Sequence, residues 1–265
     1  MNFLQIIWQP NPTFINIFGL EIRWYGVLYA TGFLLGYYIL KKIVKKENLS
    51  EKLADTISLY VIIGTIIGAR LGHCLFYEPD YYLSNPLEIL NLRQGGLASH
   101  GGALGVGIAL FLFSRKYKFP FHWTLDRVLI PASLVASLIR IGNLINSEIY
   151  GIPTNLPWAF IFVKSDPLMI PRHPTQIYEA LAYFLLFLAL YRIYFKTKKI
   201  LPPYFISAIF LISCFTFRFF VEFIKDVQVD FEKNLPLNMG QLLSIPFILI
   251  GIFFLFYSKK LKKSN

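Results

Sequence analysis

The chain alternates between long apolar runs and short polar connections. Each of seven apolar segments approaches the roughly 17–25 residues that a helix needs to cross about 30 Å of hydrocarbon. The segments cover residues 24–43, 56–77, 97–114, 124–145, 175–195, 203–224 and 239–257. The pattern predicts an all-α integral membrane protein with seven transmembrane helices. Residues 1–265 would form a single polytopic domain, with residues 146–173 as a short outer loop.

Composition supports a membrane protein. Hydrophobic residues make up 55% of the chain and the mean hydropathy is +0.53, which is too apolar for a soluble domain. Residues 1–20 lack a basic leading segment, so we expect no cleavable signal peptide.

The positive charge is concentrated on one side of the predicted membrane. The net charge is +11, with 26 lysines and arginines. One side carries sixteen of them: five at 41–52, three at 115–118, four at 192–199 and four at 259–263. The other side carries Arg23, Arg93, Lys164, Arg172, Lys225 and Lys233, and four more lie within spans. The positive-inside rule places the N-terminus outside and the C-terminus in the cytoplasm. The charge therefore indicates topology and contact with anionic lipids, and we expect no nucleic-acid partner.

One predicted span ends with an arginine and two amides. A charged side chain at the centre of a span costs roughly 2.5–3.5 kcal/mol, so Arg140 needs a compensating partner or function. At about 100° per residue, Arg140, Asn143 and Asn146 fall within roughly 120° of one helix face. This polar stripe predicts a site for an anion, with Glu148 beyond the helix end.

Every other predicted span also carries polar side chains toward its outer end. Intramembrane ionisable groups are functional candidates, and their convergence at one depth predicts a site near the outer leaflet. The side chains concerned are Tyr25, Arg70, His100, His173, Arg218 with Glu222, and Gln241.

Several of these residues have simpler interpretations. Arg218 and Glu222, four residues apart, would neutralise each other. His173, before a proline, would cap the fifth helix, and Tyr25 would belong to an interfacial aromatic belt. His100 is flanked by glycines that leave its ring uncrowded, which favours a reactive role.

The sequence gives no indication of a metal or cofactor. The four histidines lie in four different segments without helical ligand spacing, so we expect neither. Cys74 and Cys214 lie in apolar segments without CxxC spacing, which is typical of buried core thiols. Glycines at positions 64, 68 and 72 and at 101, 102 and 105 predict close helix packing.

Guanidinium groups at headgroup depth suit a phosphate, which they bind through bidentate hydrogen bonds. Amides and a tyrosine would orient hydroxyls, and a histidine would accept a proton near neutral pH. The pattern favours a membrane enzyme that acts on a phospholipid headgroup. Two alternatives are a lipid or anion transporter, which needs polar groups along its whole path, and a receptor-like seven-span protein, which needs no reactive histidine.

Recognisable stretches occur in order from about residue 24 to 246. They are Trp24-Tyr25-Gly26, Gly68-Ala69-Arg70, Gly95-Gly96, His100-Gly101-Gly102, Arg140 to Glu148 with Gly151, Arg172-His173-Pro174, Gln176, Tyr178-Glu179, Arg218 with Glu222, and Met239-Gly240-Gln241. In these stretches the chain resembles the bacterial prolipoprotein diacylglyceryl transferases. The resemblance implies that the diacylglyceryl group of phosphatidylglycerol moves to the lipobox cysteine thiol of a prolipoprotein signal peptide, at the outer leaflet of the bacterial cytoplasmic (inner) membrane. A thioether forms and glycerol 1-phosphate leaves, in the first step of lipoprotein maturation.

The resemblance also implies roles for individual residues. His100 would deprotonate the thiol or instead orient the lipid, while Arg140 and Arg218 would stabilise charge on the leaving phosphate. Lys225 stands where the family pattern leads us to expect arginine. The expected substrate-binding residues are Arg140, Asn143, Asn146, Glu148, Tyr25, Arg70, Glu222, Gly151 and Gln241.

Overall fold

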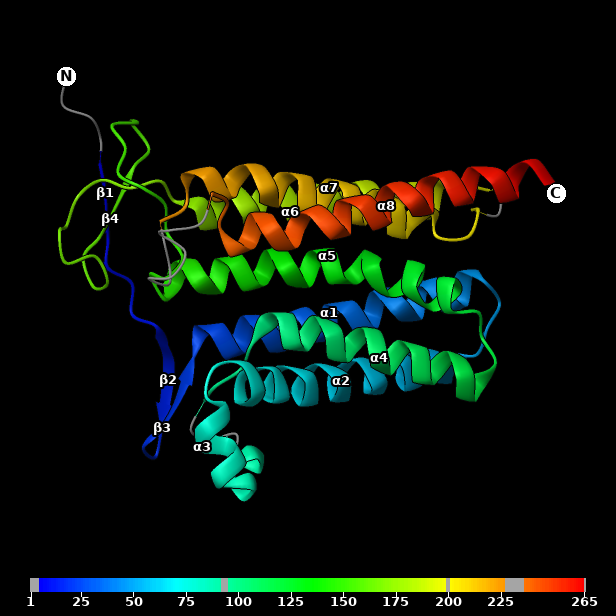
Figure 1. Ribbon diagram of the computed structural model, residues 1–265, viewed down its shortest axis with the longest axis horizontal. Coiled ribbons are helices and arrows are strands. Elements are labelled where there is room, and N and C mark those ends of the chain that lie inside the picture. The colour runs from blue at the N-terminus through cyan, green and yellow to red at the C-terminus, as the bar shows by residue number, and fades with distance from the viewer. Residues whose placement is uncertain (1–4, 92–94, 199–200, 227–235, 265) are drawn as a thin grey trace. The chain divides into compact units, whose positions relative to one another are not determined.

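The computed structural model describes residues 5–91, 95–198, 201–226 and 236–264. Each apolar segment forms an α-helix (Figure 1). The helices are α1 (Trp24–Lys46), α2 (Lys52–Phe76), α4 (Ser99–Tyr117), α5 (Phe121–Ile145), α6 (Thr175–Lys196), α7 (Phe205–Val221) and α8 (Met239–Ser264). Three basic residues of the topology argument, Arg93, Lys199 and Lys233, lie outside the described residues.

Within the described ranges, six helices are long and apolar enough to cross a membrane. They are α1, α2, α5, α6, α8, and α7 extended by the short 3-10 helix η3 (Glu222–Ile224). The helix α4 is not one of the six. The prediction of an all-α, multi-pass membrane protein is confirmed, whereas the seventh span and the orientation of the termini stay predictions.

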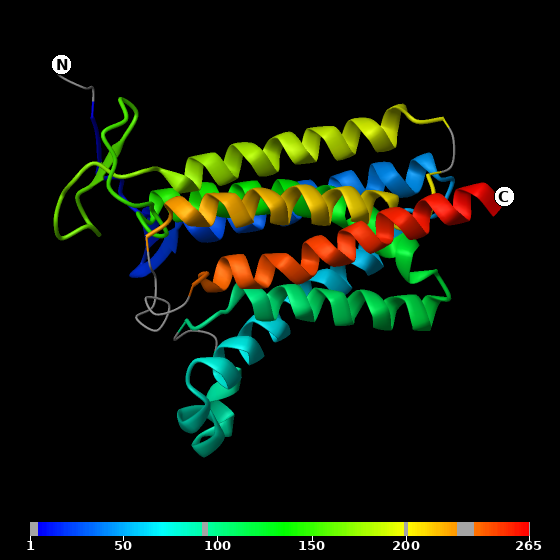
Figure 2. The same cartoon turned by 45° about the horizontal axis from the view of Figure 1, so that its top comes forward.

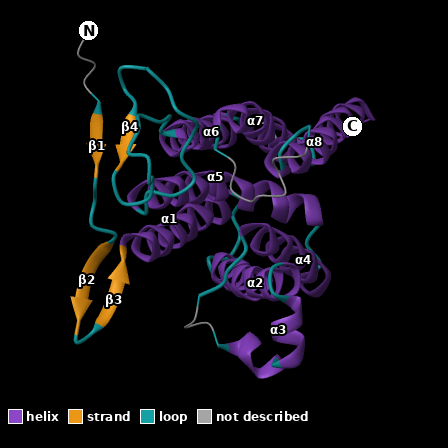
Figure 3. Cartoon of the chain, turned by 60° about the vertical axis from the view of Figure 1, so that its left-hand side comes forward, coloured by secondary structure: helices purple, strands orange, loops and turns teal. Residues whose placement is uncertain are grey.

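Short elements connect the long helices. The helices α3 (Pro79–Ser84) and η1 (Pro86–Leu90) follow α2. Strand β1 (Ile6–Trp8) pairs in parallel with β4 (Phe160–Phe162), and β2 (Thr13–Ile17) forms a hairpin with β3 (Leu20–Arg23) (Figure 3). The sequence did not predict these strands, because runs of three to five residues are too short for a clear alternating pattern.

The chain divides into two compact units. The first unit contains residues 1–36 and 126–265, and the second contains residues 37–125. The first unit holds the four strands, the beginning of α1, most of α5, and α6 to α8. The second unit holds the rest of α1, the helices α2 to α4, and the beginning of α5.

In the first unit, α6, α7 and α8 run side by side (Figure 2). Ser137 Oγ on α5 donates to the carbonyl oxygen of Ala180 on α6 at 2.8 Å. The connecting loop between α5 and α6 carries β4 and has its own small core, in which Phe160 and Phe162 pack with Leu144 at the end of α5. These contacts hold the carboxyl end of α5 beside the amino end of α6.

In the second unit, glycines bring α2 and α4 into close contact. A Cβ atom added at Gly72 would lie 2.7 Å from the Cα of Gly101, and one at Gly64 would lie 2.6 Å from the Cβ of Ala109. No larger residue fits such an approach, which confirms the predicted close packing. Cys74 and Cys214 are both buried and free, as predicted.

Candidate active site

A buried ion pair links α5 and α6 in the first unit. Arg140 Nε lies 3.2 Å from Oε2 of Glu179, with side-chain exposures of 12% and 0%. Tyr183 OH donates to the other carboxylate oxygen at 3.0 Å. The charge of Arg140 is therefore compensated within the protein by Glu179.

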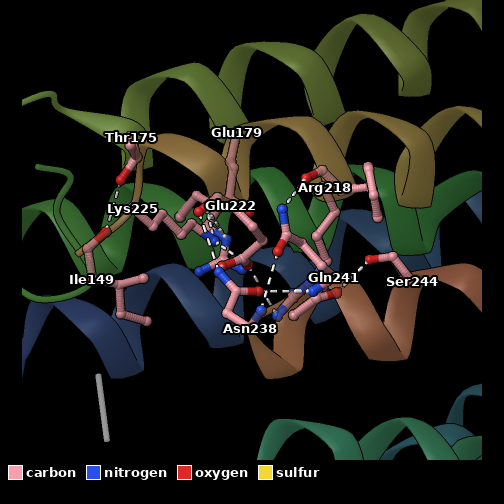
Figure 4. A network of polar contacts seen from close by, with 12 residues as sticks. Ile149, Thr175, Glu179, Arg218, Glu222, Lys225, Asn238, Gln241 and Ser244 are labelled. Carbon is pink, nitrogen blue, oxygen red and sulfur yellow. Dashed lines mark hydrogen bonds and ion pairs between the residues drawn. The ribbon is translucent and has the colours of Figure 1, made fainter. Parts of the chain in front are cut away.

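Together with this pair, one network of ion pairs contains three cations and two carboxylates. Figure 4 labels Glu179, Arg218, Glu222 and Lys225. Lys225 Nζ lies 3.1 Å from Oε2 of Glu179 and 2.8 Å from Oε1 of Glu222. Arg218 Nη2 lies 3.6 Å from the same oxygen of Glu222, and its side chain is 32% exposed. Arg218 and Glu222 form the expected pair, but Glu222 is shared with Lys225. These five directly paired side chains, called the charge cluster, carry one positive charge in excess. The count does not include Glu148, which is joined to Arg140 only through Asn143.

The amides predicted beside Arg140 form a chain of hydrogen bonds. Arg140 Nη1 donates to Asn143 Oδ1 at 3.2 Å, and Asn143 Nδ2 donates to Glu148 Oε1 at 2.6 Å. Asn146 Nδ2 reaches the same oxygen at 3.4 Å. Because α5 ends at Ile145, Glu148 lies beyond the helix, as predicted, and reaches back to hold the amides.

Gln241 belongs to a cap at the start of α8. Its backbone N–H donates to Asn238 Oδ1 at 2.9 Å, and the N–H of Asn238 donates to Gln241 Oε1 at 3.1 Å. This reciprocal capping box satisfies two otherwise unpaired donors. Asn238 Nδ2 also donates to Oε2 of Glu222 at 3.2 Å. Gln241 therefore orients Asn238, which in turn holds a carboxylate of the charge cluster.

Gly151 and Tyr25 occupy tightly packed positions. A Cβ atom at Gly151 would lie 2.6 Å from the Cβ of His173, and Gly151 forms an antiparallel bridge with Lys225. Gly151 thus allows the loop between α5 and α6 to pass close to the segment that carries Lys225. Tyr25 on α1 packs against Gly142 on α5, where an added Cβ atom would lie 2.8 Å from its ring.

His173 does not cap α6 with its side chain. Pro174 occupies the capping position, and His173 Nδ1 lies 3.3 Å from the hydroxyl of Tyr178. Trp158 Nε1 donates to that hydroxyl at 2.8 Å. Burial lowers the pKa of His173, which favours the neutral imidazole at pH 7.

In the second unit, Arg70 is 3% exposed, and its acceptors among the described residues are backbone carbonyls. The acceptors are Ile89 at 2.8 Å, Glu88 at 2.6 Å, Asn91 at 3.0 Å, Gly95 at 2.6 Å and Gly96 at 3.3 Å. A guanidinium has five N–H donors, and these five bonds use them. Arg70 thus links the residues at the end of η1 to Gly95 and Gly96, whose φ angles are +82° and +76°.

His100 lies in the first turn of α4 and is exposed. Its ring contacts Phe76 and Tyr77, each with a centroid separation of 5.8 Å. The following glycine, Gly101, packs against α2, so helix packing explains it without a role in exposing the imidazole. Arg70 and His100 belong to the second unit, and all other candidates belong to the first.

The sequence assigned no role to Glu179, Tyr183 or Asn238, although Glu179 lies in one of the stretches that match the family, and it treated Lys225 only as a departure. A usable signal existed for Glu179, since it is an ionisable residue in an apolar segment, which is the criterion that selected Arg140. Among the described residues, no cluster of three or more His, Cys, Asp or Glu side chains is arranged to hold a metal ion.

Comparison with known proteins identifies the family. A family model described as "Prolipoprotein diacylglyceryl transferase" matches residues 12–257. The chain belongs to the prolipoprotein diacylglyceryl transferase family. The resemblance inferred from the sequence is thereby confirmed, as is the assignment to the transferases.

Relatives named phosphatidylglycerol–prolipoprotein diacylglyceryl transferase match over nearly their whole length. The protein of Chloroherpeton thalassium is 46% identical, covering 96% of this chain and 95% of its own. That of Bacteroides fragilis is 45% identical, with 98% and 97% covered. That of Tolumonas auensis is 42% identical, with 97% and 99% covered.

Proposed function

We propose that this protein transfers the diacylglyceryl group of phosphatidylglycerol to the lipobox cysteine thiol of prolipoproteins. The products are a thioether-linked lipoprotein precursor and glycerol 1-phosphate, in the first step of bacterial lipoprotein maturation. Its partners are phosphatidylglycerol, signal peptides with a lipobox, and the surrounding membrane lipids. The observation that carries this proposal is the excess positive charge of the charge cluster, with three cations around two carboxylates.

Arg218 and Arg140 bind the phosphate in this proposal. Arg218 is 32% exposed and approaches Glu222 only at 3.6 Å, so its planar fork is available for two phosphate oxygens. Arg140 is oriented by Glu179 and Asn143. In a poorly hydrated site, such fixed donors stabilise the charge that develops on the leaving phosphate.

The reaction is a displacement at the glyceryl carbon that carries the phosphate ester. The cysteine sulfur attacks this carbon, the C–O bond breaks, and glycerol 1-phosphate leaves with the bonding electrons. His100 accepts the thiol proton, a role that suits an imidazole near neutral pH. The substrate supplies the nucleophile, so Cys74 and Cys214 take no part.

The remaining candidates position these groups. Asn143, Asn146 and Glu148 hold Arg140. Glu222 orients Arg218 and Lys225, and Gln241 acts through Asn238 to hold Glu222 in place. Gly151 permits the close approach of the loop to the segment of Lys225, and Tyr25 covers α5 near Arg140. Arg70 holds the end of η1 and the two glycines that precede α4. The hydrogen bonds and contacts of these residues support the assignments.

We further propose seven spans in the cytoplasmic (inner) membrane, with α4 as the seventh. Its 19 residues extend roughly 28 Å at 1.5 Å per residue, close to the hydrocarbon thickness. The basic residues support an outer N-terminus and a cytoplasmic C-terminus. Residues 1–265 then form one polytopic domain, with residues 146–173 as the outer loop and the site toward the outer leaflet.

The activity is tested with purified protein, phosphatidylglycerol and a synthetic lipobox peptide, followed by mass spectrometry of the peptide. We expect the mass of one diacylglyceryl group to be added at cysteine. Phosphatidylethanolamine in place of phosphatidylglycerol, or a peptide with serine in place of cysteine, should give no product. Absence of lipidated peptide from the complete reaction would contradict the proposal, and a transporter or receptor would leave the peptide unmodified.

A further inference from the structure

A cavity of about 290 Å³ lies between α6 and α7 in the first unit. Small side chains create its space, and larger apolar ones form its walls. The lining includes the small residues Ala182, Ala189 and Ser213 and the larger residues Tyr183, Leu186 and Phe217. Both helices belong to the six that are long and apolar enough to cross a membrane. The cavity, called the groove from here on, therefore lies at the level of the hydrocarbon.

One end of this groove reaches the charge cluster. Tyr183 lines the groove, and its hydroxyl donates to Glu179, the carboxylate that binds Arg140 and Lys225. On the facing helix, Phe217 lines the groove and directly precedes Arg218. An apolar surface therefore leads into a region of excess positive charge.

The other end runs along the helices, away from the charges. From Ala182 to Ala189 the lining covers roughly 10 Å of α6 at 1.5 Å per residue. An occupant must be apolar along this length and anionic at the end that meets the arginines. A phospholipid with an anionic headgroup has this arrangement, whereas a zwitterionic lipid would leave the excess positive charge uncompensated.

We propose that this groove binds one acyl chain of the anionic phospholipid whose phosphate is held by Arg140 and Arg218. This inference rests on the proposed function and extends it to the path of the lipid chain. Lipid tails are as apolar as the groove, so the groove adds little affinity. Its contribution is orientation, because a fixed chain holds the glyceryl carbon in line for attack.

Photolabelling tests the proposal directly. The intact protein is placed in phosphatidylcholine vesicles with phosphatidylglycerol that carries a diazirine in the middle of one acyl chain. After irradiation, mass spectrometry should locate the label at residues 182–189 and 213–217. Unlabelled phosphatidylglycerol should suppress this labelling and phosphatidylcholine should not. Equal suppression by both lipids, or labelling only elsewhere, would overturn the proposal.

A matched pair of variants on α6 provides the control. Ala189→Phe fills the groove, whereas Leu188→Phe adds bulk at a neighbouring exposed position that does not line it. We expect Ala189→Phe to abolish the suppressible labelling and to lower transfer by roughly tenfold to a hundredfold, with Leu188→Phe near the unmodified protein. Equal effects of the two substitutions would contradict a specific groove.

The two proposals fail differently. If the unmodified protein lipidates the peptide but labelling at the groove is not specific for phosphatidylglycerol, the groove proposal alone is wrong. If it neither lipidates the peptide nor binds phosphatidylglycerol, the proposed function is wrong, and the groove proposal falls with it.

Discussion

Arg140 Nε lies 3.2 Å from Oε2 of Glu179, a carboxylate with no exposed side-chain surface. The cost of placing Arg140 in an apolar span is thus offset by a residue of the same protein. A bound anion is favoured by the net charge of the whole charge cluster. Lys225 and Arg218 add two positive charges to the neutral pair and Glu222 adds one negative charge, which leaves one positive charge in excess.

Arg140→Ala should nearly eliminate transfer. The substitution removes a phosphate contact and leaves Glu179 with Lys225 as its remaining cation. Removing a fixed donor to charge that develops in the transition state typically costs about 10²–10³ in rate, so we expect a loss of roughly a hundredfold or more. Arg140→Lys should restore only part of the rate, because an ammonium cannot bind two oxygens in one plane. Transfer rates are measured at equal membrane abundance.

A double substitution separates binding from stability. In Arg140→Met combined with Glu179→Gln, both charges of the pair are removed, so thermal stability in detergent should recover relative to Arg140→Met alone. Transfer should not recover, because the phosphate contact is still missing. Full transfer by Arg140→Ala would remove Arg140 from the mechanism.

Lys225→Met should lower both transfer and membrane abundance. Lys225 is held between Glu179 and Glu222 with 2% of its side chain exposed. Without its ammonium the charge cluster loses its excess positive charge, and we expect a loss of roughly a hundredfold. Lys225→Arg keeps the charge and should retain transfer within about tenfold. Equal activity of the methionine and arginine variants would show that the charge is not required.

His100→Gln should lower transfer by about 10²–10⁴-fold while phosphatidylglycerol binding is retained. Turnover is measured with saturating lipid and peptide. If His100 is the base, the loss should shrink as pH approaches the thiol pKa of about 8.5, because the substrate then ionises without assistance. A loss that is independent of pH and accompanied by weaker lipid binding would assign His100 to lipid orientation instead.

The outer loop, residues 150–173, should open in acid, and it should open at a higher pH when Arg172 is replaced. Arg172 donates to both carboxylate oxygens of Asp166, at 2.6 and 3.0 Å, and these bonds hold the pKa of Asp166 below its usual 3.8. A carboxyl with a lowered folded-state pKa stabilises the fold above its unfolded-state pKa, and this contribution disappears as pH falls through the lowered value. As the pH falls, hydrogen exchange of residues 150–173 should therefore stay slow down to pH 3.8 and become faster only below that value.

Arg172→Gln is the corresponding variant. It removes one partner of a buried ion pair, so hydrogen exchange in the loop should already be faster at neutral pH. Arg172 Nη1 also donates to Asp226 at 2.8 Å. Because Asp226 directly follows Lys225 in the chain, the substitution should also disturb Lys225 and lower transfer. An exchange profile identical to that of the unmodified protein would exclude a structural role for this pair.

Reporter fusions test the orientation of the chain. A reporter that works only outside the cytoplasm should be active when inserted in residues 146–173 and inactive at residues 115–120 or at the C-terminus. The uneven distribution of basic residues motivates this expectation. Activity at residues 115–120 would contradict the proposed orientation.

The sequence predicted features that depend on local patterns. The apolar segments form helices, because the length and hydropathy of a segment are properties of the local sequence. The predicted span 124–145, for example, corresponds to α5 (Phe121–Ile145). Arg140 and Asn143 interact because their spacing places them on one helix face. The partnership of Glu179 and Lys225 was not predicted, because it depends on how α6 packs against a segment distant in sequence.

Arg70 illustrates a second limit. Its position in a span resembles that of Arg140, yet its donors bind the backbone carbonyls of a neighbouring loop. Every residue presents a carbonyl, so no side-chain pattern indicates such an acceptor set. The charge in an apolar segment was correctly recognised as needing a partner, and only the fold distinguishes an internal partner from a ligand.

Phosphatidylglycerol affinity tests the central claim that the charge cluster binds the lipid phosphate. Binding is measured in phosphatidylcholine nanodiscs for the unmodified protein and for Arg218→Gln, which removes the most exposed guanidinium of the cluster. A charged hydrogen-bonding contact contributes about 1.5–3 kcal/mol, so the variant should bind roughly tenfold to a hundredfold more weakly. Unchanged affinity in Arg218→Gln, or equal binding of phosphatidylglycerol and phosphatidylcholine by the unmodified protein, would contradict the account.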